Sequence, residues 1–440
     1  MRTRLRHSWV LLRSRFWFIP GLMVVGSALL AGVALTIDSS LAGAALPGWV
    51  YAGGADGARA LLSTVAGSMI TVAGLGFSIT IVALVLASTQ FGPRLLTLFM
   101  RDATSQATLG TFAGTFTFCI LVLRTIRGPD EGGDPFVPQL AITIAIGLTL
   151  VSVAGLIYFF DHVAVAIQAP KLVASVARDL DRAIDNLYPG DLGHSGPAPE
   201  PDAIPTQETD AVVLAAASGY VQVVDEIALL DLACRHDLCV RLTTRPGLFV
   251  VRGNSILIAR PRERVDEVLA AQLQSTLIIG DVRTAEDDIE FSVRQLVEVA
   301  LRALSPAIND PFTAMAAVDW LGAALARLAE EELPSRYRYD DGKLRVVADI
   351  STFGGIAHTI FSRIRHYGGT SPVVLNRLLE AVAAFGPRIQ TAEDRKLVRD
   401  ETEAVLRMGR ALITSDADLA ELERRYRAAV TALAPAEGDG

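Results

Sequence analysis

The chain has 440 residues, of which 51% are hydrophobic and only 20% are charged. This composition is too apolar for an ordinary soluble protein, and the apolar excess lies in the first 160 residues, so we expect an integral membrane protein. The formal net charge of −8, without a basic patch interleaved with aromatic residues, argues against a nucleic-acid partner.

Four stretches are long and uncharged enough to cross a bilayer as helices, which takes about 20 residues each. They are residues 16–37, 61–88, 109–123 and 140–160. The expected fold is therefore an α-helical membrane bundle of four transmembrane helices, followed by a cytoplasmic α+β region. That region should begin with a small β-rich unit and continue as a mostly helical part.

Basic residues predict the orientation of these helices. They precede the first stretch, separate the second from the third, and follow the fourth: Arg2, Arg4, Arg6, Arg13, Arg15, Arg94, Arg101, Lys171, Arg178 and Arg182. The positive-inside rule then places both termini in the cytoplasm. A signal peptide is the alternative for the first stretch, because Ala42-Gly43-Ala44 resembles a cleavage site, but the apolar run is longer than a typical signal core.

Small and hydroxyl side chains line one face of the second stretch, which carries no charge over 28 residues. This stripe consists of Thr64, Gly67, Ser68, Thr71, Gly74 and Ser78. Such a stripe either lets another helix approach closely or lines a polar path through the membrane. Both interpretations stay open, although close helix packing is the commoner one.

Four residues are candidates for the inner mouth of a pore: Arg94, Arg101, Asp102 and His162. The two arginines flank an apolar face after the second stretch, which is typical of an interfacial helix and also compatible with a gate. His162 follows the fourth stretch and could respond to pH there. No acidic or histidine residue lies deep in a predicted span, which argues against a proton- or cation-coupled transporter.

Three long motifs carry a family resemblance. They are TVAGLGFSITIVALVLASTQFGPRLLTLFMRD, LGTFAGTFTFCILVLRT with its GxxxG pattern, and ALSPAINDPFTA. They resemble a bacterial family of predicted membrane proteins, domain of unknown function 2254. The resemblance implies a protein of the bacterial inner membrane with N-terminal spans and a cytoplasmic C-terminal region, and it brings no established activity.

Composition shifts predict how the chain divides. Pro, Gly and acidic residues indicate a flexible linker, and short β-branched runs after it indicate strands. The expected parts are a transmembrane domain 1–160, a helical stalk 161–189, a linker 190–210, a small β-rich unit 211–260, a mainly helical domain 261–433 and a disordered tail 434–440. Within the helical domain, residues around Asp341-Gly342 predict a β-hairpin.

A helix break in the C-terminal region forms a second candidate site. Ser305-Pro306 should end one helix, and Asp310 followed by Pro311 should cap the next. We expect a corner made by Arg294, Ser305, Asn309 and Asp310. These side chains could satisfy backbone groups freed by the break, or they could bind a ligand or a neighbouring subunit.

The sequence gives no positive sign of a metal site, a cofactor or catalytic residues. In the cluster of Cys234, His236, Asp237 and Cys239, the two cysteines and the histidine are potential zinc ligands, three where a structural site needs four. The chain has no Walker A loop, HExxH motif, nucleophile elbow or CxxC pair.

Three functions are compatible with these features. The first is a homo-oligomeric ion channel or channel-like protein that is gated or sensed by its cytoplasmic domain, with an unknown ligand. The second is a non-conducting membrane scaffold or envelope-stress sensor. The third is a membrane-anchored enzyme that uses the corner from Arg294 to Asp310.

Overall fold

The structure is a computed structural model with two compact units, Met1–Lys171 and Leu172–Gly440. It describes residues 16–41, 47–92, 102–128, 135–166, 168–186, 194–195, 204–283, 288–331, 335–368 and 371–434. Arg94, Arg101, most of the predicted linker and all of the predicted tail except Ala434 lie outside these residues.

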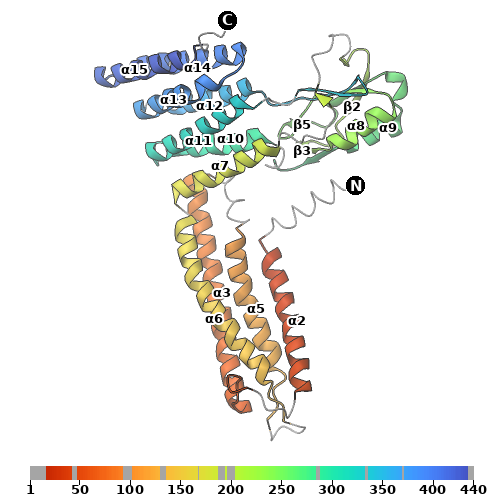
Figure 1. The fold of residues 1–440 in the computed structure, drawn as a ribbon, viewed down its shortest axis with the longest axis vertical. Helices are drawn as coiled ribbons and strands as arrows, with labels where there is room; N and C mark the ends of the chain where they lie inside the picture. The colour runs from red at the N-terminus through yellow and green to blue at the C-terminus, as the bar shows by residue number, and fades with distance from the viewer. Residues whose placement is uncertain are drawn as a thin grey trace. The chain divides into compact units, whose positions relative to one another are not determined.

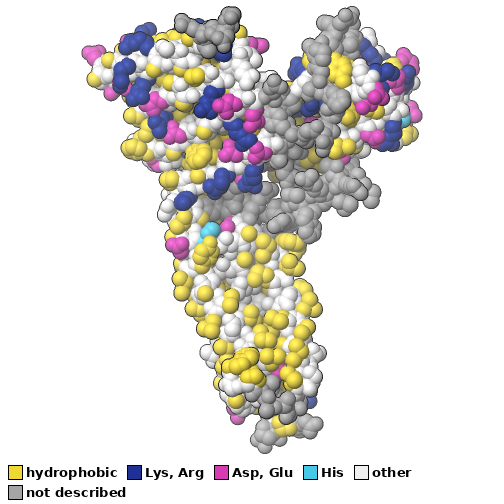
Figure 2. Space-filling model, viewed as in Figure 1, with side chains coloured by type: hydrophobic (Ala, Val, Ile, Leu, Met, Phe, Trp, Pro, Cys, Tyr) yellow, Lys and Arg dark blue, Asp and Glu magenta, His cyan; other side chains and the backbone are white. Residues whose placement is uncertain are grey.

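Long apolar helices form the N-terminal unit (Figure 1). They are α2 (Phe18–Ser40), α3 (Ala55–Phe91), α5 (Ala103–Leu123) and α6 (Gln139–Ala166). Helix α5 packs against the other three and is the most deeply buried of them. Its Phe112, Phe118, Cys119 and Val122 are fully buried. Hydrophobic and uncharged side chains cover the visible face of this unit, whereas charged side chains gather on the C-terminal unit (Figure 2).

Small residues set the spacing between α2 and α5. A Cβ atom at Gly110 would lie 2.5 Å from Sδ of Met23, and one at Gly114 would lie 2.5 Å from Oγ of Ser27. A larger side chain at either position would require atoms of α2 to shift. The GxxxG pattern of the third predicted stretch is therefore a close helix contact.

Polar contacts also join helices of this unit. The carboxylate of Asp38, at the end of α2, accepts hydrogen bonds from the backbone N–H groups of Leu140 and Ala141 at 2.9 and 2.8 Å. It thereby satisfies the free N–H groups in the first turn of α6. Deeper in the unit, the buried hydroxyls of Thr115 and Ser152 lie 3.0 Å apart. Both contacts connect segments far apart in the sequence.

Among the described residues, five helices are long and apolar enough to cross a membrane, so the predicted count of four is not exact by this measure. The fifth is α11 (Pro311–Glu330), which belongs to the C-terminal unit. Its apolar face is buried against α10 (Ile289–Ala303) and α13 (Pro372–Phe385). Its Asp319 pairs with Arg377 of α13, with Oδ1 and Nε 2.5 Å apart. Helix α11 is thus the least apolar of the five, and it packs within the C-terminal unit.

A series of helices continues the C-terminal unit. It contains α10, α11, α12 (Phe353–Gly368), α13, α14 (Ala392–Leu412) and α15 (Asp416–Ala432). The N-cap side chains of α10, α11, α14 and α15 accept hydrogen bonds from their own first turns: Asp288, Asp310, Thr391 and Ser415. These caps explain why the helices begin where they do.

Helix α7 (Ala169–Asn186) differs from the predicted continuous stalk. Helix α6 ends at Ala166, and α7 begins three residues later as a separate helix of the C-terminal unit. Its apolar face, which includes Val173, Leu180 and Ile184, is buried. Arg327 of α11 donates to the carbonyl of Asp181 at 3.3 Å and also pairs with Asp185.

Two sheets form the β-rich part. The six-stranded sheet has the order β1 (His194–Ser195), β8 (Tyr337–Asp340), β9 (Lys343–Val347), β4 (Cys239–Leu242), β6 (Ser255–Arg260) and β2 (Ala211–Leu214). The three-stranded sheet has the order β5 (Phe249–Val250), β3 (Gly219–Val224) and β7 (Leu277–Gly280). Helices α8 (Glu226–Arg235) and α9 (Glu267–Ser275) pack with these strands around one hydrophobic core.

The β-rich part is larger than the predicted unit 211–260. Residues 277–280 form a strand where a helix was expected, and the hairpin β8–β9 joins the sheet from about 80 residues further along. Strand β9 inserts beside β4 in parallel, so the pairing depends on contacts that no local pattern contains. The hairpin itself is confirmed, with positive φ at both Asp341 and Gly342, as a tight turn of this kind requires.

Candidate functional site

The small-residue stripe of α3 faces away from the rest of the N-terminal unit. All six of its residues are exposed, and a Cβ atom at Gly67 or Gly74 would meet nothing within 4 Å. The buried face of α3 is instead formed by Ala58, Leu62, Ala66, Met69, Ala83 and Ala87. Thr71 follows Met69 by two residues, a rotation of about 200°, so the stripe lies opposite the packing face.

The hydroxyls of the stripe bond to their own helix. Those of Thr64, Ser68 and Thr71 donate to carbonyl oxygens three or four residues earlier, at 2.7, 2.9 and 2.8 Å. The stripe therefore needs no outside partner to satisfy these donors. It still offers a shallow, weakly polar surface on which another helix or water could lie.

The outer face of α3 changes character after Ser78. Large apolar side chains follow on the same side of the helix and are exposed: Ile81, Val82, Val85 and Leu86. Small side chains are common in the first half of this face, where the exposed Leu75 also lies, and large side chains follow in the second half.

Two of the predicted inner-mouth residues meet at one end of the N-terminal unit. Asp102 caps α5 by accepting from the N–H of Ser105 at 3.0 Å, and His162 Nε2 donates to the same carboxylate at 2.9 Å. The ring of Tyr158 stacks on that of His162 with centroids 5.9 Å apart. Each of the two side chains is about a quarter exposed, at 26% for Asp102 and 27% for His162.

The predicted corner holds three of its four residues together. Asp310 accepts from the N–H and the hydroxyl of Thr313 at 3.1 and 2.5 Å, and Asn309 has a positive φ of 48°. The carbonyl of Ser305 accepts from the N–H of Asn309 at 2.8 Å. Arg294 lies more than two turns before the break and bonds instead to Glu290 at 3.0 Å. These contacts end one helix and cap the start of the next.

A buried ion network centred on Glu290 was not anticipated. Its carboxylate accepts from Arg245 at 2.6 Å, from Arg294 at 3.0 Å and from the hydroxyl of Ser351 at 3.1 Å. Arg245 also pairs with Asp349 at 3.1 Å. Burial opposes ionisation of Glu290, but the guanidinium groups of Arg245 and Arg294 outweigh it and lower the pKa of this carboxyl. The network joins three segments that are distant in the sequence.

The cysteine cluster is engaged in local contacts. The thiol of Cys234 donates to Asp340 at 3.2 Å, and Asp237 binds Arg264, Lys343 and Arg345. Burial raises the pKa of Cys239 to about 11. Within the described parts of the chain, no three His, Cys, Asp or Glu side chains are placed to hold a metal ion.

Taken together, these features define an integral membrane protein: an N-terminal unit of long apolar helices, and a C-terminal unit with charged surfaces and its own core. The chain belongs to the family described as "Predicted membrane protein (DUF2254)", which matches residues 13–384. The resemblance drawn from the three motifs is thereby confirmed.

Relatives in mycobacteria extend this match. The uncharacterized proteins Mb1321c of Mycobacterium bovis and Rv1290c of Mycobacterium tuberculosis are each 32% identical to this chain over 419 residues. The alignment covers 93% of this chain and 79% of each relative. No solved structure matches the chain.

Proposed function

We propose that the protein is a homo-oligomeric, channel-like protein of the bacterial inner membrane, assembled through the α3 stripe. Helices α2, α3, α5 and α6 cross the bilayer, with both termini in the cytoplasm. Helix α11 stays in the cytoplasmic unit, because its Asp319 is paired with Arg377 and its apolar face is already covered.

The direction of the stripe carries this proposal. Small and hydroxyl residues on a lipid-facing surface gain little from contact with acyl chains, whereas a second copy can approach them closely. The large apolar residues after Ser78 lie on the same outer face and suit lipid or a subunit contact. Copies that turn their stripes toward a shared axis would line it with hydroxyls and glycine backbone, which can support a polar path.

The pair of Asp102 and His162 supports a mouth at the cytoplasmic end of this path. The pair connects the start of α5 to the end of α6 and places an acidic and a basic side chain at that junction. The C-terminal unit begins just after α6 and is therefore well connected to act as the sensing or gating part.

A scaffold or envelope-stress sensor is the second candidate. One observation favours it: the hydroxyls of Thr64, Ser68 and Thr71 already bond to their own helix. A dry seam between copies needs only the small size of these residues. In that case the assembly is the same, and no ions pass.

Ion flux from proteoliposomes tests the channel. The variant Thr71→Leu should reduce flux strongly, while Thr149→Leu should leave it unchanged, because Thr149 on α6 makes the same kind of backbone bond away from the stripe. Equal flux in both variants, or no flux from the unaltered protein, would count against a pore. If the unaltered protein conducts no ions and the Thr71→Leu variant no longer associates into oligomers, the scaffold is favoured.

A further inference from the structure

A cavity of about 340 Å³ lies at one end of the six-stranded sheet. It is lined by residues of β4, β8 and β9, by residues that adjoin these strands, and by Ile204 before β2. Its volume is within the range of small-molecule sites, which also combine apolar walls with a few polar groups. Nothing in the comparisons or in the sequence motifs assigns a role to it.

The strand register places the lining groups. Arg241 of β4 and Tyr337 of β8 are both paired with Val347 of the strand between them, so the three lie in one row across the sheet. Arg336 precedes Tyr337, and its carbonyl accepts from the N–H of Ala348 at 2.7 Å. The register thus places Val347 between Arg241 and Tyr337 on one face of the sheet. Arg336 lies just before β8 and is also one of the residues that line the cavity.

The positive charge of the cavity is poorly balanced. Among the residues that the structure describes, the guanidinium of Arg336 has no hydrogen-bond partner, and that of Arg241 has only a long contact of 3.4 Å to the carbonyl of Pro205. Among the described lining residues the one carboxylate is Asp349, which is paired with Arg245 at 3.1 Å. Two arginines therefore remain available to an anion.

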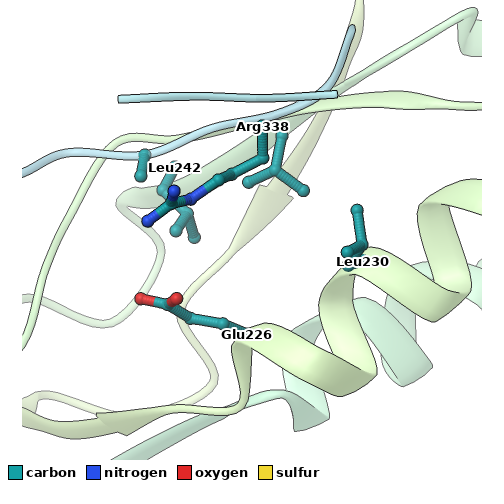
Figure 3. Close-up of a pocket in the computed structure, with 6 residues that line it drawn as sticks. Glu226, Leu230, Leu242 and Arg338 are labelled. Atoms are coloured by element: carbon teal, nitrogen blue, oxygen red, sulfur yellow. The ribbon is translucent and has the colours of Figure 1, made fainter. Parts of the chain in front are cut away.

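A smaller neighbouring cavity shows the contrast. It holds about 20 Å³ and shares Leu242 and Ala348 with the larger one. Figure 3 shows Arg338 directed toward Glu226 across this space. A carboxylate thus faces the arginine here, whereas in the described lining of the larger cavity no carboxylate is paired with Arg241 or Arg336.

We propose that the larger cavity binds a small molecule that carries a phosphate group. The planar donors of Arg241 and Arg336 would bind the phosphate oxygens in pairs, and the Tyr337 hydroxyl would add a further donor. The apolar lining, from Ile204 and Leu242, would contact the rest of the molecule. The assignment is independent of the proposed channel, since it concerns a site within the C-terminal unit alone.

Calorimetric titration of the purified full-length protein in detergent tests this site. The probes are inorganic phosphate, glycerol phosphate and ADP, with succinate as a dicarboxylate of comparable charge. The double variant Arg241→Gln/Arg336→Gln should weaken binding of the phosphate probes by about tenfold or more, because it removes two charge-assisted contacts. The control Arg262→Gln removes an exposed arginine outside the cavity and should leave binding unchanged.

Each outcome decides the question. Binding of ADP alone identifies a nucleotide-like ligand. Binding of glycerol phosphate alone identifies a lipid headgroup. Binding of all three phosphate probes identifies a general phosphate site. No binding of any phosphate probe, equal binding in both variants, or succinate bound as tightly as phosphate would overturn the proposal. The single variant Arg336→Gln alters an exposed side chain and should fold normally. If it binds the phosphate probes more weakly while its thermal unfolding is unchanged, the loss of binding is not caused by misfolding.

Discussion

At the scale of single residues, several helix caps and ion pairs of this chain are made by carboxylates. Asp102 and Asp310 each cap a helix, Asp38 caps a helix other than its own, and Glu290 binds two arginines. Capping by Asp310 was predictable, because the cap and its helix are adjacent in the sequence. The role of Asp38 was not, because its partners lie about 100 residues away and only the packing of α2 against α6 brings them together.

Replacing Asp38 with alanine should destabilise the N-terminal unit by about 1–2 kcal/mol, the usual range for a lost helix cap with a favourable charge. Asp38→Asn should lose less, since its side-chain oxygen can still accept one bond. Unfolding of the reconstituted protein by denaturing detergent measures both. If the Asp38→Ala variant were as stable as the Asp38→Asn variant, the contact of this side chain with α6 would not matter for stability.

Replacing Glu290 with glutamine should destabilise the C-terminal unit by about 3 kcal/mol, because Arg245 and Arg294 lose their buried counter-charge. The matched change Glu403→Gln breaks an exposed pair with Arg407 and should shift stability by less than about 0.5 kcal/mol. Thermal unfolding of the two variants gives the comparison. Similar shifts in both would contradict a structural role for the network.

The loss of stability in Glu290→Gln should depend on pH in a defined direction. The pKa of Glu290 is lower in the folded chain than in the unfolded chain, where it is about 4.3. Its stabilising contribution is therefore complete above that value and is lost as the pH falls through the folded pKa. The difference between the unaltered protein and Glu290→Gln should shrink in acid. A difference that grows below pH 4 would contradict this.

The thiol of Cys239 should react slowly at neutral pH. Its pKa of about 11 leaves roughly 100-fold less thiolate at pH 8 than an ordinary cysteine has. Alkylation by iodoacetamide can be followed by mass spectrometry in a Cys119→Ser/Cys234→Ser background. Unfolding should restore an ordinary rate. Equal rates in the folded and unfolded chain would mean that burial does not protect this thiol.

The scale of elements shows what local patterns can and cannot predict. Periodicity and caps located most helices, and Asp341-Gly342 located the hairpin. Neither could show that β9 enters the sheet beside β4, or that residues 277–280 form a strand, since both depend on distant partners. The small-residue pattern found both surfaces of interest, yet it could not tell the seam between α2 and α5 from the outward stripe of α3.

Glycine substitutions separate these two surfaces. Gly114→Leu should force α2 away from α5 and destabilise the unit by several kcal/mol, because the new side chain meets Ser27. Gly147→Leu on α6 meets nothing within 4 Å and should be tolerated. Detergent unfolding of the monomer compares them. A stable Gly114→Leu variant would show that the contact can relax.

At the scale of the whole molecule, composition alone indicated a membrane protein, and the family match confirms that class. Composition alone could not separate α11 from the membrane spans, because α11 is long and apolar enough to be one yet packs within the C-terminal unit. It also could not show that α7 belongs to that unit, because the pattern of α7 is simply that of an amphipathic helix. Hydrophobic content measures how much surface must be covered, and tertiary contacts decide what covers it.

The most direct test of the proposed function is the accessibility of single cysteines to a membrane-impermeant thiol reagent. Thr71→Cys lies on the stripe, and Ile157→Cys is an exposed apolar position on α6, both in a Cys119→Ser background in native membranes. We expect Thr71→Cys to be labelled and Ile157→Cys to be protected, because only the stripe faces water between copies. Protection at both positions would contradict a water-lined stripe.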